Sequence, residues 1–351
     1  MKTDIIKNIY GQKICKQWIV YNYLFLIILI SPLFICNSVI AKPATLQPVL
    51  LTPVKLILQW YPQTQFAGFY IAKNKGFYAN YGIDLKIISG GPDANPSQML
   101  ADKMADFGTM FLSSAIKSYD SGLKLVNVGQ IVQRSALMLI ARKGTGINTI
   151  KDLHGKRIGM WNEEFQLQPR ALFKREGIKV NLIRQSPSFD LFMRGGLDAV
   201  PAMWYNEYHT LSSYGLDYNE MVTFFFNDLG FNFPEDGIYC LRSTLNKKSD
   251  MVHNFVKATA KGWDYTFAHP EEALNIVLSI MKKKKIRANK SHQRWMLDRM
   301  KDIILLDKNT KPDMVLGKTE YEFVVNTLLK LGFISNAPVY YDFYKKIRIQ
   351  K

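Results

Sequence analysis

The clearest alternation of apolar and polar residues begins at residue 54. Four apolar residues stand at alternate positions, with Lys55 and Gln59 among the residues between them. They are Val54, Leu56, Leu58 and Trp60. This period of two predicts a strand with one buried face. Aromatic residues then recur at helical spacing up to Gly76, which predicts a helix that ends there, followed by a strand at 83–88. Because ligands of open α/β sheets usually bind beyond the carboxyl ends of strands, the turn at 60–65 is a candidate ligand site.

Strand and helix patterns continue to alternate along the chain. Further strands are predicted at 106–110, 124–130, 157–160, 180–184 and 238–242. Helices are predicted at 96–104, 113–119, 168–176 and 189–193, and after residue 243 at 249–268, 270–285, 289–304 and 319–331. This order predicts an α/β fold with parallel sheets and right-handed crossovers. The turn and strand around Asp106 resemble those around Asp198, which suggests that the chain has two lobes and that each contains the same kind of αβ unit.

The first 41 residues have the pattern of a secretory signal peptide. Four lysines precede a strongly apolar run at 18–35, and Val39-Ile40-Ala41 fits a cleavage site after Ala41. The sequence therefore predicts a periplasmic or secreted protein. An uncleaved membrane anchor is the alternative, since the run is long enough to span a bilayer. Residues 42–53 contain three prolines and are predicted to be a short tether.

Charge and cysteine content narrow the possible partners. The net charge is +17, but the lysines are scattered over the chain, so nucleic acid is not a predicted partner. The expected link to a membrane is the signal segment or a permease. Cleavage leaves Cys240 as the single cysteine, in an apolar strand where a small buried side chain is expected. The five histidines are isolated in sequence, so no metal site is predicted.

Five short motifs, in order, carry a resemblance to a known family. The first motif spans 60–85 and contains Trp60-Tyr61-Pro62 and Tyr81-Gly82-Ile83-Asp84-Leu85. The others lie at 106–108, 152–159, 198–207 and 261–273. Over residues 54–280 the chain resembles periplasmic solute-binding proteins of the thiamine-pyrimidine type, within the SsuA- and thiamine pyrimidine synthase-like superfamily. The resemblance implies a type II periplasmic-binding-protein fold, in which two α/β lobes joined by a hinge hold a ligand in the cleft between them. The first lobe is expected at 54–134, the second at 135–240, and a return to the first lobe with C-terminal helices at 241–351.

The same superfamily contains enzymes and binding proteins, and three positions separate them. The synthase resemblance implies a lysine that carries pyridoxal phosphate, a histidine consumed as substrate, and a cysteine cluster that holds iron. Here these positions fall on Met110, on Ser114 and on the segment Asp236–Cys240, which has one cysteine. Methionine forms no Schiff base, and one thiolate does not hold iron. We therefore expect no enzyme activity and no cofactor.

The expected function is that of the exported substrate-binding protein of an ABC importer, with a membrane permease as partner. The expected ligand is a small heterocycle such as formylaminopyrimidine or hydroxymethylpyrimidine. A thiamine pyrimidine synthase-like enzyme and a ligand-sensing module for a membrane receptor are the alternatives.

Five candidate ligand-binding residues lie in the first lobe. Trp60 can stack on a planar ring, and the Gln65 amide can bond a ring nitrogen or amino group. Gly90 would allow the backbone to approach the ligand closely. Thr109 and Ser113 stand at a strand end and a helix start, where free N–H groups can meet a ligand.

The second lobe and the hinge supply the remaining candidates. The loop Asn162, Glu163, Glu164 and Phe165 matches the phosphate-holding loop of the synthase, but its two acids favour a neutral or cationic ligand. Tyr205, Asn206 and Glu207 form the other group, and the resemblance places Glu207 against the aminopyrimidine, where a carboxylate accepts from an amine. Asp236 is expected to join this group at the hinge.

Overall fold

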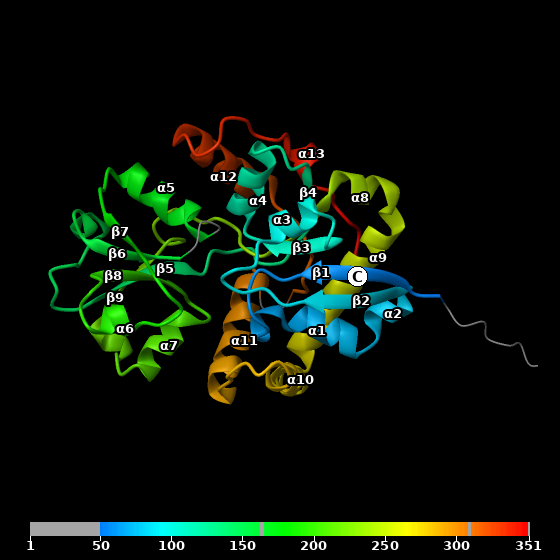
Figure 1. Cartoon of the computed structure of the whole chain (residues 1–351), viewed down its shortest axis with the longest axis horizontal. Coiled ribbons are helices and arrows are strands. Elements are labelled where there is room, and N and C mark those ends of the chain that lie inside the picture. Colours follow the sequence, from blue (N-terminus) through cyan, green and yellow to red (C-terminus); the bar gives the residue numbers. More distant parts are fainter. Residues whose placement is uncertain (1–49, 162–164, 308–309, 350–351) are drawn as a thin grey trace, which may run out of the picture. The chain divides into compact units, whose positions relative to one another are not determined.

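The computed structural model describes residues 50–161, 165–307 and 310–349. The predicted signal peptide, most of the tether, and the candidates Asn162, Glu163 and Glu164 lie outside these ranges. Two five-stranded sheets with helices around each form the framework (Figure 1). Within the described ranges, no helix has both the length and the apolar character needed to cross a bilayer.

The first sheet has the strand order β2-β1-β3-β10-β4. Its strands are β1 (Thr52–Ile57), β2 (Ile83–Ile88), β3 (Phe107–Met110), β4 (Leu125–Gln130) and β10 (Gly237–Leu241). β1 is parallel to β2 and β3, whereas β10 is antiparallel to β3 and β4. β1 begins inside the segment predicted as a tether, because Thr52 and Pro53 already pair with Ile83 and Asp84.

The second sheet has the order β7-β6-β8-β5-β9. Its strands are β5 (Leu137–Arg142), β6 (Arg157–Met160), β7 (Asn181–Arg184), β8 (Ala199–Met203) and β9 (Met221–Phe225). β6 is parallel to β7 and β8, but β5 is antiparallel to β8 and β9. The prediction of parallel sheets is therefore confirmed for β1 with β2 and β3 and for β6 with β7 and β8, and it was wrong for the pairs that involve β5 and β10. β5 and β10 each enter a sheet directly after the chain has crossed from the other one, so no helical crossover requires them to be parallel.

Helices cover both sheets. The longer ones are α1 (Ala67–Asn74), α4 (Leu112–Asp120), α5 (Leu167–Glu176), α9 (Ser249–Ala268), α10 (Pro270–Lys283), α11 (Lys290–Ile304) and α12 (Lys318–Lys330). The shorter ones are α2 (Phe77–Asn80), α3 (Pro96–Ala101), α6 (Asp190–Met193), α7 (Glu207–Ser213), α8 (Arg242–Lys247) and α13 (Tyr340–Phe343), with single 3-10 turns that include η1 (Thr64–Phe66). Most agree with the predicted helices to within a few residues. α3 begins as expected, since the side chain of Asn95 accepts from the Gln98 backbone N–H at 2.9 Å and Pro96 follows.

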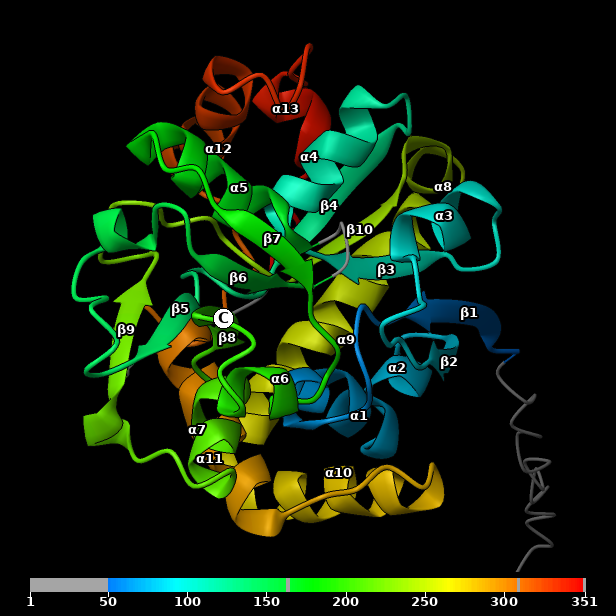
Figure 2. The ribbon, with the colours of Figure 1, turned by 60° about the vertical axis from the view of Figure 1, so that its left-hand side comes forward.

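Helices α1 and α9 pack closely against one another beside the first sheet (Figure 2). A Cβ at Gly68 would overlap the buried ring of Trp263, and a Cβ at Gly262 would overlap the carbonyl oxygen of Gly68. Phe255 of α9 stacks on Phe107 of β3, with ring centroids 3.9 Å apart. The small residues let two helix backbones approach, and the aromatic stack fixes α9 to the sheet.

Two segments connect the sheets, one after β4 and one after β9. The backbone carbonyl of Asp236 accepts from the N–H groups of Ile131 and Val132 at 3.1 and 3.3 Å. One carboxyl oxygen of the neighbouring Glu235 accepts from Ser135 Oγ, Ala136 N and Leu137 N at 2.9, 2.7 and 3.2 Å. The two connections are thus bonded to each other and form one structural joint.

Glu235 is buried in this joint, in surroundings that disfavour its ionised form. The residue is 1% exposed, and its second carboxyl oxygen has no hydrogen-bond partner. Burial, and then the charge of Asp236, raise the pKa of Glu235 well above its usual value. Both effects favour the protonated carboxyl of Glu235 over a second negative charge beside Asp236.

Candidate ligand-binding site

A pocket lies where strands of both sheets end at their carboxyl termini. Its empty space is about 360 Å³, which includes solvent at its mouth. Lining residues follow β1 (Gln59, Trp60, Gln63 and Gln65), β3 (Phe111), β6 (Trp161 and Phe165) and β8 (Met203, Tyr205, Asn206 and Glu207, with Met203 the last strand residue). β1 and β3 are parallel neighbours, as are β6 and β8, so their ends meet at one edge of each sheet. This is where open α/β sheets usually bind ligands.

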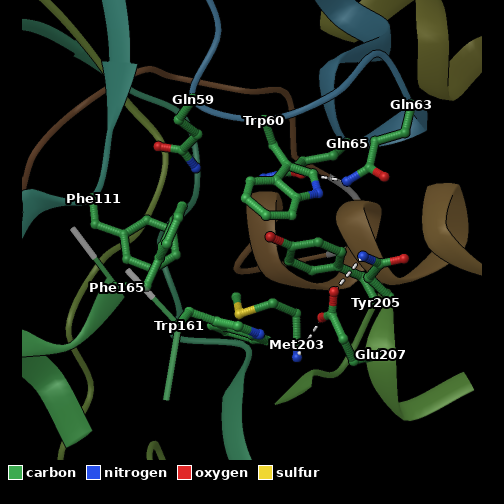
Figure 3. A pocket seen from close by; sticks show the side chains of 11 residues that line it. Gln59, Trp60, Gln63, Gln65, Phe111, Trp161, Phe165, Met203, Tyr205 and Glu207 are labelled. Atoms are coloured by element: carbon green, nitrogen blue, oxygen red, sulfur yellow. Dashed lines mark hydrogen bonds between the residues drawn. The ribbon is translucent and has the colours of Figure 1, made fainter. Parts of the chain in front are cut away.

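Aromatic rings form one side of the pocket, with Phe165 at their centre (Figure 3). Its ring centroid lies 5.7 Å from that of Trp60, 5.1 Å from Phe111 and 6.1 Å from Trp161. The three interplanar angles lie between 77° and 87°, the edge-to-face geometry that aromatic pairs prefer. The indoles of Trp60 and Trp161 line the pocket on either side of Phe165.

Glutamine side chains form a directed network behind Trp60. Gln63 donates to the carbonyl of Gln65 at 2.7 Å, and Gln65 donates to the carboxylate of Asp236 at 2.8 Å. Gln59 donates to the other oxygen of the same carboxylate. Burial raises the pKa of Asp236 to about 6, and the two glutamine bonds oppose that increase. An ionised Asp236 carboxylate can only accept hydrogen bonds, so the side chains of Gln59 and Gln65 must turn their NH₂ groups toward it.

Gln59 is buried, although the sequence predicted it to be exposed. The apolar and polar alternation placed it on the outer face of a longer strand, but β1 ends at Ile57 and Gln59 is 2% exposed. Its backbone N–H donates to Thr109 Oγ1 at 2.9 Å, and its side chain meets Asp236. The carbonyl oxygen of the Gln59 side chain is buried and has no partner. A buried polar side chain is held at this strand end by partners remote in sequence.

Glu207 supplies the charged group among the described lining residues. Its carboxyl oxygens accept from the Met203 backbone N–H at 2.9 Å and from Asn206 Nδ2 at 2.6 Å. The residue as a whole is half-buried, but its carboxyl group is enclosed by these contacts. Burial raises the pKa of Glu207 to about 7, and the hydrogen bonds oppose the increase. The group can therefore accept from a ligand amine and can change its protonation near neutral pH.

Tyr205 places a hydroxyl beside these groups. Burial, and then the negative charge of Asp236, raise the pKa of Tyr205 well above its usual value. The phenol therefore keeps its proton.

The structure brings together six of the predicted site residues. Trp60, Gln65, Phe165, Tyr205, Asn206 and Glu207 all line the pocket. Four other predicted residues do not line the pocket but lie close to residues that do. Thr109 accepts from the Gln59 backbone N–H, and Asp236 accepts from the side-chain amides of Gln59 and Gln65. Ser113 is buried in α4 at 2% exposure. Gly90 packs on the chain after β1, where a Cβ would overlap the carbonyl oxygen of Leu58, so its small size serves backbone packing.

Five lining residues were not among the predicted ones. They are Gln59, Gln63, Phe111, Trp161 and Met203. Position alone could have indicated Trp161, which follows β6 as Trp60 follows the first strand pattern, and Phe111, which follows β3. Gln59 and Gln63 carried no such signal, because their burial depends on Asp236 and on the fold of the turn.

The residues at the synthase positions do not fit pyridoxal phosphate or iron. Met110 is buried in β3 at 2% exposure and presents a thioether instead of an amine. Ser114 lies in α4 and has no imidazole. Cys240 is fully buried, and burial raises its pKa to about 12. Among the described residues, no three His, Cys, Asp or Glu side chains are grouped in a way that could hold a metal ion.

Related sequences include both binding proteins and enzymes. The chain is 26% identical over 254 residues to the riboflavin-binding protein RibY of Chloroflexus aurantiacus, covering 69% of this chain and 70% of that one. It is 24% identical over 240 residues to the formylaminopyrimidine-binding protein of Halalkalibacterium halodurans, covering 65% and 71%. It is 23% identical over 243 residues to the 4-amino-5-hydroxymethyl-2-methylpyrimidine phosphate synthase of Legionella pneumophila, covering 64% and 72%.

The fold matches solved binding proteins. The periplasmic aliphatic sulphonate-binding protein SsuA of Escherichia coli superposes with a TM-score of 0.64 at 13% identity, covering 85% of this chain and 94% of that one. This likeness confirms the predicted periplasmic-binding-protein fold and two α/β lobes. The model of the family described as NMT1/THI5 like matches residues 63–273, which include most of the pocket residues. The chain belongs to the NMT1/THI5-like family.

Proposed function

We propose that this protein is the exported solute-binding component of an ABC importer and binds a planar nitrogen heterocycle of the aminopyrimidine kind. The observation that carries the proposal is the pairing of an aromatic wall with a buried acceptor. Trp60 and Trp161 offer ring faces, and Glu207 offers carboxylate oxygens in the same pocket. A flat ring with an exocyclic amine satisfies both.

The charge of the pocket supports this ligand class over an anion. The described lining residues include Glu207 and no lysine, arginine or histidine. A buried carboxylate without a compensating cation disfavours a sulfonate or phosphate. Two relatives named for their ligands, riboflavin and formylaminopyrimidine, bind flat nitrogen heterocycles, which fits the same class.

Binding without turnover is the second part of the proposal. Relatives named as pyrimidine synthases exist, but Met110 and Ser114 stand where the resemblance implies the cofactor lysine and the substrate histidine. Incubation with pyridoxal phosphate should therefore produce no Schiff-base absorbance. Appearance of that absorbance at one equivalent, lost on substitution of a pocket residue, would favour the enzyme.

Titration calorimetry on the purified mature protein tests the ligand class. We expect saturable heat with formylaminopyrimidine or hydroxymethylpyrimidine, and quenching of tryptophan fluorescence as the ring meets Trp60 and Trp161. Riboflavin serves as a larger heterocycle and an aliphatic sulfonate as an anionic control. Absence of heat with every heterocycle, or preference for the sulfonate, would contradict the proposal.

A further inference from the structure

Helix α11 carries two neighbouring residues that are bonded to opposite walls of the pocket. Gln293, 3% exposed, accepts from the backbone N–H of Thr64 at 2.8 Å, and its own carbonyl accepts from the Thr64 hydroxyl at 2.8 Å. Thr64 lies between the wall residues Gln63 and Gln65. The adjacent His292 has its Nε2 2.9 Å from Oδ1 of Asn206, in the wall that follows β8. Consistent with these bonds, α11 packs against both η1 and α7, and Figure 2 shows α7 beside α11.

Asn206 links His292 to Glu207 through two hydrogen bonds, and the donor and acceptor of each bond can be assigned. The ionised carboxylate of Glu207 accepts from Asn206 Nδ2, so the Oδ1 of Asn206 is left as an acceptor. His292 must then donate from Nε2, and in a neutral ring its Nδ1 becomes an acceptor. His209 Nδ1 lies 3.1 Å from that nitrogen and must supply the proton. The sequence of donors therefore runs from His209 through His292 and Asn206 to Glu207.

The surroundings keep both imidazoles neutral and in place. Burial, and then repulsion from His209, lower the pKa of His292 to about 4, and burial also lowers the pKa of His209. Trp295 packs on His209 with ring centroids 5.2 Å apart and donates from Nε1 to the carbonyl of Trp204 at 3.1 Å. The guanidinium of Arg299 lies over the rings of both tryptophans, at 4.9 and 4.7 Å. Aromatic packing thus flanks the histidine end of the chain of hydrogen bonds.

We propose that His292 is a positioning residue of the ligand site: it holds Asn206, and through Asn206 the carboxylate of Glu207, in the orientation that receives a ligand amine. His292 itself does not line the pocket. The inference rests on the proposed function, because it assigns a task to the Glu207 carboxylate in binding.

Binding of formylaminopyrimidine to three variants tests the role. His292→Leu removes the donor and should weaken affinity about 10-fold, whereas His292→Gln keeps an N–H of similar reach and should recover most of the loss. Arg294→Ala, which breaks an exposed ion pair with Glu271 on the same helix, is the matched control and should bind as wild type. Wild-type affinity in His292→Leu, or equal losses in the Leu and Gln variants, would overturn the proposal.

Ring nitrogen shifts measured by ¹⁵N NMR test the chain without a ligand. We expect His292 as the Nε2–H tautomer and His209 as the Nδ1–H tautomer, with His209 changing tautomer in Asn206→Leu or His292→Leu. His209 as Nε2–H in the wild type would overturn the inference and leave the proposed function standing. If the wild-type protein binds none of the heterocycles, the proposed function is overturned. The binding role of His292 then fails with it, whichever tautomers His292 and His209 adopt.

Discussion

The rings of Trp60 and Phe165 meet edge to face, with centroids 5.7 Å apart and planes at 87°. Trp60 follows β1 in the first sheet, and Phe165 follows β6 in the second. One aromatic contact therefore joins residues that the two sheets bring to the pocket separately. Both rings line the pocket, so this contact belongs to the wall that the proposed planar ligand would meet.

Trp60→Ala should raise the Kd for formylaminopyrimidine about 10- to 100-fold, since stacking on an aromatic side chain contributes about 1–3 kcal/mol. Titration calorimetry measures this. Tyr61→Ala is the control, because Tyr61 contacts the Trp60 ring but is 40% exposed and does not line the pocket. Equal losses in the two variants would remove Trp60 from the ligand contact.

Glu207 should make the ligand-free protein less stable as the pH rises toward neutrality. Its pKa is 4.5 in the unfolded chain and about 7 in the folded one, so the folded state binds more protons between those values. Stability therefore falls as pH rises through this window. Glu207→Gln cannot ionise, so its stability relative to wild type should increase by about 1–3 kcal/mol from pH 4.5 to 8. Urea unfolding at several pH values measures the difference, and a difference independent of pH would contradict the raised pKa.

Glu235 should tolerate an amide but not a truncation. Glu235→Gln keeps the oxygen that accepts from Ser135, Ala136 and Leu137 and should cost less than about 1 kcal/mol, because the raised pKa of Glu235 favours a neutral carboxyl in the folded protein. Glu235→Ala removes the acceptor of the Ser135 hydroxyl and of the Ala136 N–H, while the Leu137 N–H keeps Ser135 Oγ at 3.3 Å, and should cost about 2–4 kcal/mol. Urea unfolding of both variants compares them. Similar losses would indicate that Glu235 is ionised in the folded protein.

Gly68→Ala should destabilise the protein by about 3 kcal/mol, since the added Cβ overlaps the buried ring of Trp263 between two helix backbones. Gly129→Ala is the matched control. Its Cβ would lie at ordinary contact distance, 3.4 Å from Val256, so we expect a change within about 1 kcal/mol. Thermal unfolding of the pair checks the difference, and a tolerated Gly68→Ala would mean that α1 and α9 can move apart.

Sequence periodicity was sufficient for most of the framework. α9 has the predicted bounds of 249–268, and β2 the predicted 83–88, because each has a clear apolar period and a clear stop. β5, at Leu137–Arg142, was not predicted. Its residues are apolar almost throughout and form a strand buried on both faces, which periodicity cannot distinguish from other buried segments.

The sequence indicated some residues of the site but not those whose positions depend on partners far away in the chain. Trp60 stands at the end of a predicted strand, and Glu207 was placed in the site by the family resemblance. Gln59 could not be placed from sequence, because its burial depends on Asp236, which is 177 residues away. His292 carried no local signal either, since its partner Asn206 lies 86 residues before it. Polar side chains whose partners are distant in sequence are the part of a site that periodicity does not reveal.

The unequal bonding of α11 has a consequence for how long a ligand stays bound. Thr64 donates to Gln293 from both its backbone N–H and its hydroxyl in a buried setting, whereas His292 holds Asn206 by one hydrogen bond. If the walls separate, we expect α11 to remain with the Thr64 turn and to part from the segment at 204–209. The slow step of ligand escape would then be the loss of the His292 and Trp295 contacts, so weakening them should shorten the residence time of the ligand more than it slows its entry.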